Sequence, residues 1–385
     1  MSPGALLDWP PPALRSNDLS SDARAIERLP PSTWIVPAVA CAWLTAKLAG
    51  LLPAAASVVV IVSTILLFAA VFASVHHAEV IALKVGEPFG TLVLALAVTV
   101  IEGSLIVSVM FSGGAESSEL ARDTVFATVM IVCNGVLGLS LLVGGLRHRV
   151  VSFKPEGTTP AVAVLATLAT LTLVLPQFTL ASDGPTYSSS QLAFAGIVSL
   201  LLYAVFIFVQ TVRHRGYFLP EDAGAEEEHA TPPTLRAALL SLGLLLVGLV
   251  AVVGLAKVLA PTIEGAVDSA DMPRAVVGIA IAMMVLLPES MSALRAARRG
   301  RLQTSMNLGL GSALATIGLT IPAVAVASIA LGLPLTLGLP PTEMVLLGLT
   351  LLLTAMTVLP GRATILQGAV HLVVFAVFLF LAMVP

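Results

Sequence analysis

The chain has 385 residues, of which 57% are hydrophobic and only 11% are charged, and its mean hydropathy is +1.01. Soluble domains carry about 25% charged residues, so the composition excludes an ordinary soluble domain and predicts an all-α integral membrane protein in a lipid bilayer. The formal net charge of −3 gives no reason to expect a nucleic-acid partner.

Residues 1–32 precede the first long apolar stretch. They are rich in proline and mixed in charge, and they lack the short apolar core of a signal peptide. We therefore expect a disordered N-terminal tail. The two cysteines, Cys41 and Cys133, lie in apolar runs, and we expect free thiols rather than a disulfide.

Apolar stretches of bilayer-spanning length then recur with short polar breaks. At about 20 residues per crossing, they predict about eleven transmembrane helices. We place these at 33–52, 54–75, 89–110, 122–146, 160–181, 191–212, 235–260, 274–294, 304–330, 341–359 and 363–384.

Lysine and arginine in the short loops predict the orientation, because cytoplasmic loops carry an excess of both. With a cytoplasmic N-terminus, only Lys47, Arg122, Lys257 and Arg274 of the 19 basic residues fall on the outer side. The run from Arg295 to Arg301 is then a topogenic cytoplasmic loop. The pattern predicts a C-terminus outside the cell.

A charged linker at 213–234 divides the chain into a first transmembrane half, 33–212, and a second, 235–385. The plan is one N-terminal helix followed by two five-helix repeats. An odd number of crossings separates equivalent helices, so the two repeats are inverted in the membrane. Inverted repeats with polar groups at the midplane are the usual plan of secondary transporters.

Two acidic residues stand deep in apolar runs, one in each half. Glu102 lies in the span 89–110 and Glu289 in the span 274–294. A carboxylate at membrane depth is costly unless it is paired, protonated or in a wet cavity. We expect both at one functional site, where Gly103 and Pro288 break their helices and free carbonyl oxygens for it.

Such a site offers only oxygen ligands, which hard cations such as Ca²⁺ prefer. Protons can neutralise the same carboxylates, so protons and cations compete, as an antiporter requires. Other polar residues of the spans support the site or bond to neighbouring helices. They are Thr99, Thr128, Asn134, Asn307 and Ser312.

Several further features have simpler explanations. His76, His77 and Glu79 form no His-Glu-x-x-His motif, and we expect a solvated helix end there, with pH sensing or cation entry as the alternative. The acidic loop 221–229 is expected to be a solvated linker, or else a cation attractor at the mouth. His371 stands alone in the last span, and we expect it to pack there.

Two long stretches resemble a known family. Gly86-Glu-Pro-Phe-Gly-Thr-Leu-Val-Leu-Ala-Leu-Ala-Val-Thr-Val-Ile-Glu102 is similar to the first alpha-repeat of bacterial calcium/proton antiporters of the ChaA type, in the cation/calcium exchanger superfamily. The stretch from Leu287-Pro-Glu-Ser to Thr-Ile-Pro322 is similar to the second. The repeats span about 86–146 and 274–330, and the resemblance implies an eleven-helix Ca²⁺/H⁺ exchanger of the bacterial inner membrane.

Carried over by position, the resemblance implies that Glu102 and Glu289 are the paired cation-binding acids. Ser312, after Gly311, and Thr128, after Ala127, match the hydroxyl positions of the two repeats. The sequence departs from the family pattern Gly-Asn-Ala-x-Glu, since Thr99 and Leu286 replace the two asparagines. Ser290 stands where plant and fungal relatives often carry histidine.

The sequence thus predicts a secondary transporter that exports Ca²⁺ in exchange for protons, with no organic cofactor. The alternative is a Na⁺(K⁺)/H⁺ antiporter using the same glutamates, because a monovalent ion needs fewer charged ligands. An intramembrane enzyme with Glu102 or Glu289 as general base and a non-transporting scaffold are the remaining rivals. The enzyme lacks an evident cluster of metal ligands in the spans.

Overall fold

The structure, a computed structural model, describes residues 30–52, 57–86, 89–113, 118–218, 233–273, 275–332 and 335–384. Residues 1–29 of the expected tail and the acidic loop 221–229 therefore lie outside it. The first half contains α2 (Pro31–Leu48), α3 (Ser57–Val85), α4 (Phe89–Gly113), α5 (Leu120–Met130), η2 (Ile131–Val136), α6 (Leu137–His148), β1 (Val150–Ser152), α7 (Pro155–Ala169), η3 (Thr170–Val174), η4 (Leu175–Phe178), α8 (Ser189–Phe208), η5 (Val209–Arg213) and α9 (Arg215–Phe218).

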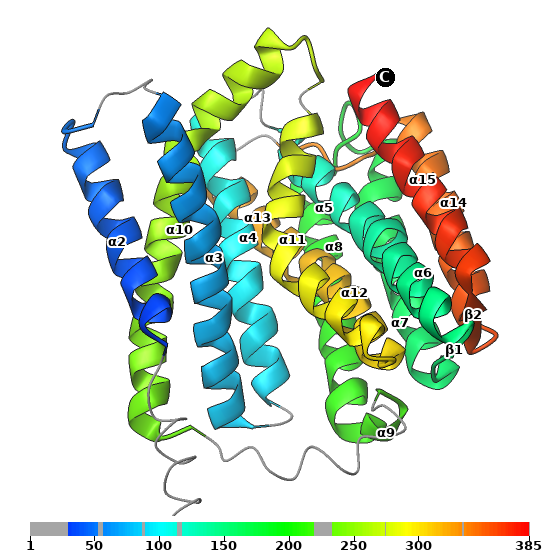
Figure 1. Ribbon diagram of the computed structural model, residues 1–385. Coiled ribbons are helices and arrows are strands. Elements are labelled where there is room, and N and C mark those ends of the chain that lie inside the picture. The colour runs from blue at the N-terminus through cyan, green and yellow to red at the C-terminus, as the bar shows by residue number, and fades with distance from the viewer. Residues whose placement is uncertain are drawn as a thin grey trace, which may run out of the picture.

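The second half repeats the plan of the first, after the linker. It contains α10 (Leu235–Ser269), α11 (Ala275–Arg298), α12 (Leu302–Ala315), η7 (Thr316–Thr320), α13 (Ile321–Leu331), α14 (Pro341–Val358), β2 (Arg362–Thr364) and α15 (Ile365–Met383). Each span predicted from sequence corresponds to one helical stretch. In the described ranges, 9 stretches are long and apolar enough to cross a membrane, which confirms an all-α membrane protein. The equivalent helices α4 and α11 run in opposite directions, as inverted repeats require (Figure 1).

The largest difference from the predicted spans is in α3. The sequence predicts an end near residue 75, ahead of the polar His76, but the helix continues to Val85. His77 is fully buried, and its Nε2 lies 2.9 Å from the carbonyl oxygen of Thr33 on α2. The expectation of a solvated helix end is therefore wrong for His77, because α2 covers this face of α3.

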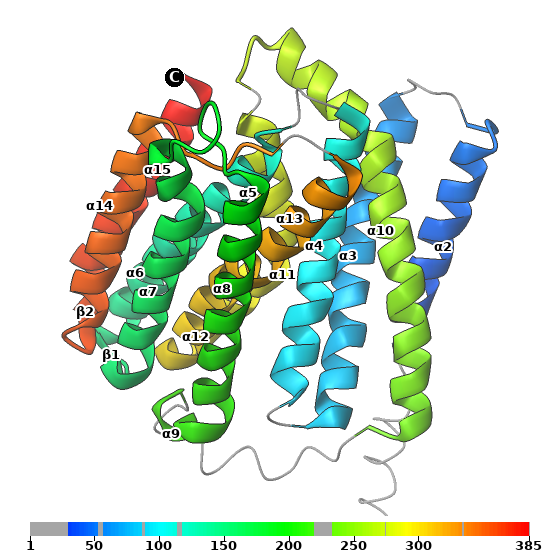
Figure 2. The same cartoon turned by 180° about the vertical axis from the view of Figure 1, so that it is seen from behind.

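The helices form two groups with the functional elements between them (Figures 1 and 2). On one side α10 packs against α3 and α2, around a core that includes Leu67 and Leu255. On the other side α6, α7, α14 and α15 surround a second core. Between the groups α4 contacts α11, η7 and α12.

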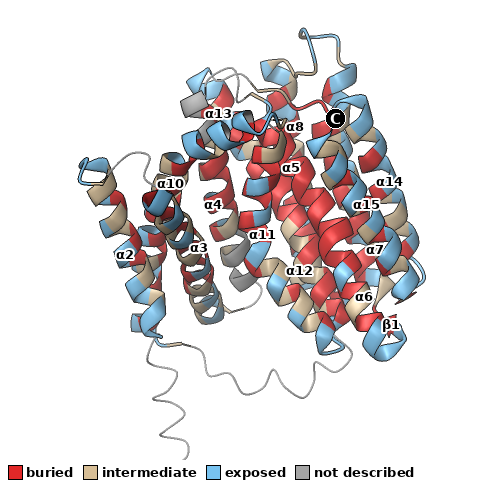
Figure 3. Cartoon of the chain, turned by 45° about the horizontal axis from the view of Figure 1, so that its top comes forward, coloured by how far each residue is buried: buried red, intermediate tan, exposed pale blue. Residues whose placement is uncertain are grey.

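Burial identifies the interior helix of the second group. In the stretch 120–148, 89% of the most apolar 18-residue window is buried, whereas the corresponding share in α15 is 22%. Figure 3 shows the same contrast, with buried residues along α5 and exposed ones on the outer faces of α14 and α15. Since lipid tails cover the outer faces of a membrane bundle, the stretch 120–148 is the scaffold and the outer helices meet lipid.

The two halves carry the same local irregularity. In each five-helix repeat the third helical stretch changes from α to π geometry, at η2 in the first repeat and at η7 in the second. Such π segments are rare and frequently lie at functional sites. A short antiparallel pairing of β1 with β2, in which Val151 faces Ala363, joins the halves at the end of α6.

Candidate functional site

Glu102 lies on α4 in the centre of the bundle, and it is 2% exposed. Its Oε2 accepts hydrogen bonds from two hydroxyls of η7, at 2.8 Å from Thr316 and 3.2 Å from Thr320. The two threonines are four residues apart, so they present their hydroxyls on one face of the segment. A carboxylate of the first half is thus held by donors of the second half.

Glu289 lies on α11, the equivalent helix of the second half. Its Oε2 is buried and has no hydrogen-bond partner within the described residues. The side chain lies in the wall of a cavity of about 110 Å³. The cavity is lined by Val98, Tyr203, Ile207, Gln210, Glu289, Asn307, Leu308, Gly311, Ser312 and Ala315.

The helices that carry the two glutamates run in opposite directions and contact each other (Figure 1). Val98, one turn before Glu102 on α4, lines the same cavity as Glu289. The fold therefore brings together the two acids that the sequence predicts at one site. Burial of two carboxylates is costly unless cations or protons neutralise them.

The other residues predicted for the site divide by location. Ser312 and Asn307 line the cavity with Glu289, although the Asn307 amide also donates to the carbonyl oxygen of Phe218. Ser290 follows Glu289 on α11 and is part-buried. Thr99 and Thr128 are buried, and neither hydroxyl has a hydrogen-bond partner in the parts of the chain that the structure describes.

Asn134 bonds to helices outside the glutamate pair. Its Nδ2 donates to Thr350 Oγ1 on α14 at 2.8 Å, and its Oδ1 lies 3.1 Å from His371 Nδ1 on α15. The other ring nitrogen of His371 lies 3.0 Å from Thr357 Oγ1. His371 therefore takes part in a buried polar network that ties η2 to the last two helices, which is more than packing.

Gly103 and Pro288 do not break their helices, contrary to the prediction. The helix α4 is continuous through Gly103, and α11 is continuous through Pro288. Glycine and proline weaken a helix, but opening the backbone at membrane depth would leave polar groups without partners. Both helices stay regular at these positions, although a Cβ at Gly103 would meet no atom within 4 Å. The irregular backbone of the site is η7, which the sequence analysis did not identify.

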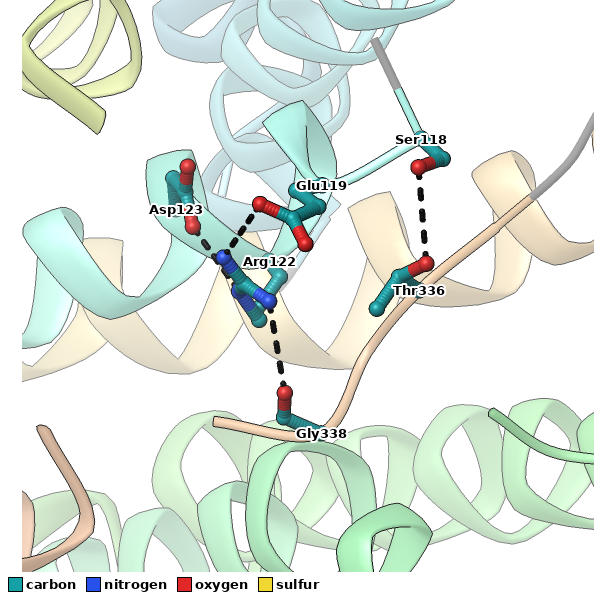
Figure 4. Close-up of polar contacts among 6 residues, drawn as sticks. All are labelled: Ser118, Glu119, Arg122, Asp123, Thr336 and Gly338. Carbon is teal, nitrogen blue, oxygen red and sulfur yellow. Dashed lines mark hydrogen bonds and ion pairs between the residues drawn. The ribbon is translucent and has the colours of Figure 1, made fainter. Parts of the chain in front are cut away.

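At the far end of the bundle from α9, a charged cluster closes the start of α5 (Figure 4). Arg122 Nε donates to Asp123 Oδ1 at 2.8 Å, and Arg122 Nη2 donates to Glu119 Oε2 at 3.0 Å. Arg122 Nη1 also reaches the carbonyl oxygen of Gly338 at 3.4 Å. Asp123 is 7% exposed, so this ion pair is buried.

The extended segment 335–339 lies across the same end and joins both halves by backbone hydrogen bonds. The N–H of Thr336 donates to the carbonyl oxygen of Ser118 at 2.9 Å, beside their hydroxyl contact in Figure 4. The N–H of Leu339 donates to the carbonyl oxygen of Leu173 at 2.8 Å. Hydrogen bonds and an ion pair therefore hold the segments together at this end of the bundle. The cavity lies toward the other end, along the C-terminal part of α8.

Sequence reasoning missed Thr316, Thr320 and Tyr203. The two threonines lie inside the stretch that carries the family resemblance, four residues apart in an apolar run. That spacing was the available signal, but it does not reveal that their partner is Glu102. Tyr203 gave no signal, since an aromatic residue in an apolar span is ordinary.

Comparison with known proteins identifies the family. Residues 55–212 and 240–384 match the family described as sodium/calcium exchanger protein. The chain is 50% identical over 353 residues to y4hA of Sinorhizobium fredii (strain NBRC 101917 / NGR234), provisionally named an ionic transporter, and this covers 92% of the chain and 96% of y4hA. It is 35% identical to the sodium-potassium/proton antiporter ChaA of Escherichia coli (strain K12), covering 80% and 84%.

Solved structures show the same fold. The native YfkE structure aligns with a TM-score of 0.68 at 18% identity, covering 92% of this chain and all of YfkE. The H⁺/Ca²⁺ exchanger CAX aligns with a TM-score of 0.65 at 17% identity, covering 90% and 87%. These identities support the shared fold alone. With the family match over most of its length, the chain belongs to the sodium/calcium exchanger protein family, as the resemblance to the cation/calcium exchanger superfamily predicts.

Proposed function

We propose that the protein exchanges cations for protons by alternating access, and that Ca²⁺ is the exported cation. The observation that carries the proposal is the pair of buried carboxylates on antiparallel helices. Glu289 faces a cavity, and Glu102 is held by hydroxyls of the opposite half. Relatives named as transporters favour this reading over an intramembrane enzyme or a scaffold.

The site chemistry suits a hard cation. Ca²⁺ takes about six to eight oxygen ligands, and the two carboxylates supply up to four oxygens with a charge of −2. The hydroxyls of Thr316, Thr320 and Ser312 provide further oxygens on the η7 and cavity sides. When no cation is bound, the same hydroxyls donate to Glu102, and protons can replace the cation on both acids.

The arrangement of the ends supports a state open toward the side of α9. The cavity that reaches Glu289 is lined by Tyr203 and Ile207, near the C-terminal end of α8, and by Gln210 of η5. The opposite end is fastened by Arg122 and by the segment 335–339. Exchange then needs a second state in which this end opens and the cavity closes.

Exchange of Na⁺ or K⁺ for protons is the second candidate. Thr99 and Leu286 replace two amide-bearing residues of the family pattern, and a monovalent ion needs fewer ligands. The 35% identical relative is named a sodium-potassium/proton antiporter, and that name favours this candidate. Both candidates use Glu102 and Glu289, so the choice between them concerns selectivity alone.

We further propose that the protein lies in the bacterial inner membrane with a cytoplasmic N-terminus and an outer C-terminus. Basic residues support this orientation, since Arg295 to Arg301 all fall on the side of α9. The test is labelling of single cysteines, introduced after Cys41 and Cys133 are replaced by serine. Arg299→Cys should react with an impermeant maleimide only in everted vesicles, and Asp183→Cys only in right-side-out vesicles. The reverse result would overturn the orientation.

The test of function is proton-gradient-driven uptake of Ca²⁺, Na⁺ or K⁺ into everted vesicles. We would compare the wild type with Glu102→Gln and Glu289→Gln, using Glu156→Gln at the exposed start of α7 as the matched control. Uptake should require both site glutamates and persist in the control. Because protons compete for the same carboxylates, a lower pH on the cation side should raise the half-saturating cation concentration. Uptake that survives both substitutions would make the acids structural.

A further inference from the structure

The π segment η7, whose threonines donate to Glu102, packs against the aromatic side chain of Tyr203. Gly318 lies between Thr316 and Thr320 in η7, and Tyr203 of α8 lies directly against it. A Cβ at position 318 would stand 2.6 Å from Tyr203 Cβ, 2.7 Å from Cγ and 3.0 Å from Cδ2. No side chain fits there, so the Tyr203 side chain lies directly on the backbone of η7 at Gly318.

The equivalent π segment of the first half, η2, makes the same kind of glycine–aromatic contact, but it does not hold a glutamate. Gly135 lies in η2, and Phe375 of α15 covers it, with ring atoms at 3.3 to 3.5 Å from a Cβ at that position. The last long helix of each half therefore carries an aromatic residue that covers a glycine in the π segment of the other half. Tyr203 of α8 covers Gly318, and Phe375 of α15 covers Gly135. Beside Gly135, however, the polar residue is Asn134, which bonds to Thr350 and His371 rather than to a glutamate.

Tyr203 also differs from Phe375 in its surroundings. Tyr203 is 2% exposed and lines the cavity together with Glu289. It therefore touches the segment that holds one glutamate and the cavity that contains the other. Phe375 is part-buried, and it packs against the second core, next to the ring of Phe378. Figure 2 shows α8 crossing in front of α12 and α13, the two helices that flank η7.

We propose that Tyr203 is a positioning residue for cation binding, whose ring sets η7 at the depth where Thr316 and Thr320 reach Glu102. This inference rests on the proposed function and adds a determinant of affinity to it. Removal of the ring leaves η7 unsupported on the α8 side, so both hydroxyls can move away from Glu102. Displaced hydroxyls no longer complete the oxygen shell of the cation, and we expect the affinity to fall on the order of tenfold.

The test compares Tyr203→Ala with the same truncation at the inverted equivalent, Phe375→Ala, and with the ring-retaining Tyr203→Phe. Two quantities are measured for each: the half-saturating cation concentration of proton-coupled uptake, and the rise in melting temperature that Ca²⁺, Na⁺ or K⁺ gives the purified protein. The melting temperature without cation reports packing alone. Tyr203→Leu replaces Tyr203→Ala if the alanine variant does not accumulate.

We expect Tyr203→Ala to raise the half-saturating concentration about tenfold and to shrink the cation-induced shift. Tyr203→Phe should resemble the wild type. Phe375→Ala should lower the cation-free melting temperature while leaving the half-saturating concentration unchanged. Equal effects of Tyr203→Ala and Phe375→Ala on cation affinity would overturn the proposal. So would a loss in Tyr203→Phe as large as in Tyr203→Ala, since the hydroxyl and not the ring would then be responsible.

Failure of the proposed function gives a different result. If the wild type moves no cation against protons, exchange itself is wrong, whatever the variants do. If the wild type exchanges cations and Tyr203→Ala exchanges them with wild-type affinity, only the role of Tyr203 is wrong.

Discussion

The Thr316 hydroxyl donates a 2.8 Å hydrogen bond to Glu102 Oε2, across 214 residues of sequence. The donor belongs to the π segment of the second half and the acceptor to a helix of the first half. Glu289 has no such partner among the described residues. The two acids, equivalent by the repeat, are therefore unequal in their surroundings: Glu102 accepts hydrogen bonds from the opposite half, whereas Glu289 faces a cavity that both halves line.

This contact predicts a specific effect of Thr316→Val, which keeps the side-chain shape and removes the donor. The hydroxyl oxygen is one of the ligands proposed for the cation, and its loss leaves the oxygen shell incomplete. The half-saturating cation concentration should therefore rise about tenfold, which corresponds to about 1.4 kcal/mol. Thr320→Val should act in the same direction. The control is Thr167→Val on α7, whose hydroxyl bonds to the carbonyl oxygen of Ala163. An equal rise in that control would contradict the prediction.

The buried ion pair at the far end predicts a loss of stability in Arg122→Leu. Asp123 would remain buried without its partner, and breaking a buried pair costs about 3–5 kcal/mol. Glu119 is 55% exposed at its side chain, so Glu119→Gln should cost only about 0–1 kcal/mol. Melting of the purified protein measures both. The double variant Arg122→Leu/Asp123→Leu should recover most of the loss; if it does not, the charge pair is not the cause.

Close packing of α11 on α5 predicts that Gly278→Ala is destabilising. An added Cβ would lie 2.9 Å from Asp123 Cβ and 3.1 Å from the backbone nitrogen of Thr124. Backbone atoms cannot move aside cheaply, so overpacking should cost about 1–3 kcal/mol. Gly243→Ala on α10 is the matched control, since nothing lies within 4 Å of that position. Equal melting temperatures for the two variants would refute the packing argument.

The network around Asn134 predicts a structural rather than a binding role. Asn134→Leu would leave the buried His371 Nδ1 and Thr350 hydroxyl without this partner, at about 1–3 kcal/mol for each unsatisfied group. The melting temperature should fall while the half-saturating cation concentration stays unchanged. A rise in that concentration with normal stability would instead return Asn134 to the cation site that the sequence predicts.

The sequence alone determined the membrane class, the span plan, the inverted halves and the two acids. These follow from local properties, because apolar length sets a crossing and a carboxylate at membrane depth is conspicuous by its cost. The same reasoning misplaced the end of α3, since His77 is polar in sequence, and Thr33, the partner that allows its burial, comes from a helix earlier in the chain.

Only the tertiary structure decided which side chains meet the acids. Gly103 and Pro288 are local signals of helix weakness, yet both lie within continuous helices, because opened backbone at membrane depth would lose its hydrogen-bond partners. Thr316, Thr320 and Tyr203 reach the site through contacts between segments that are more than 100 residues apart in the sequence. Such contacts depend on how the two halves pack, and the pattern of either half by itself does not contain that information.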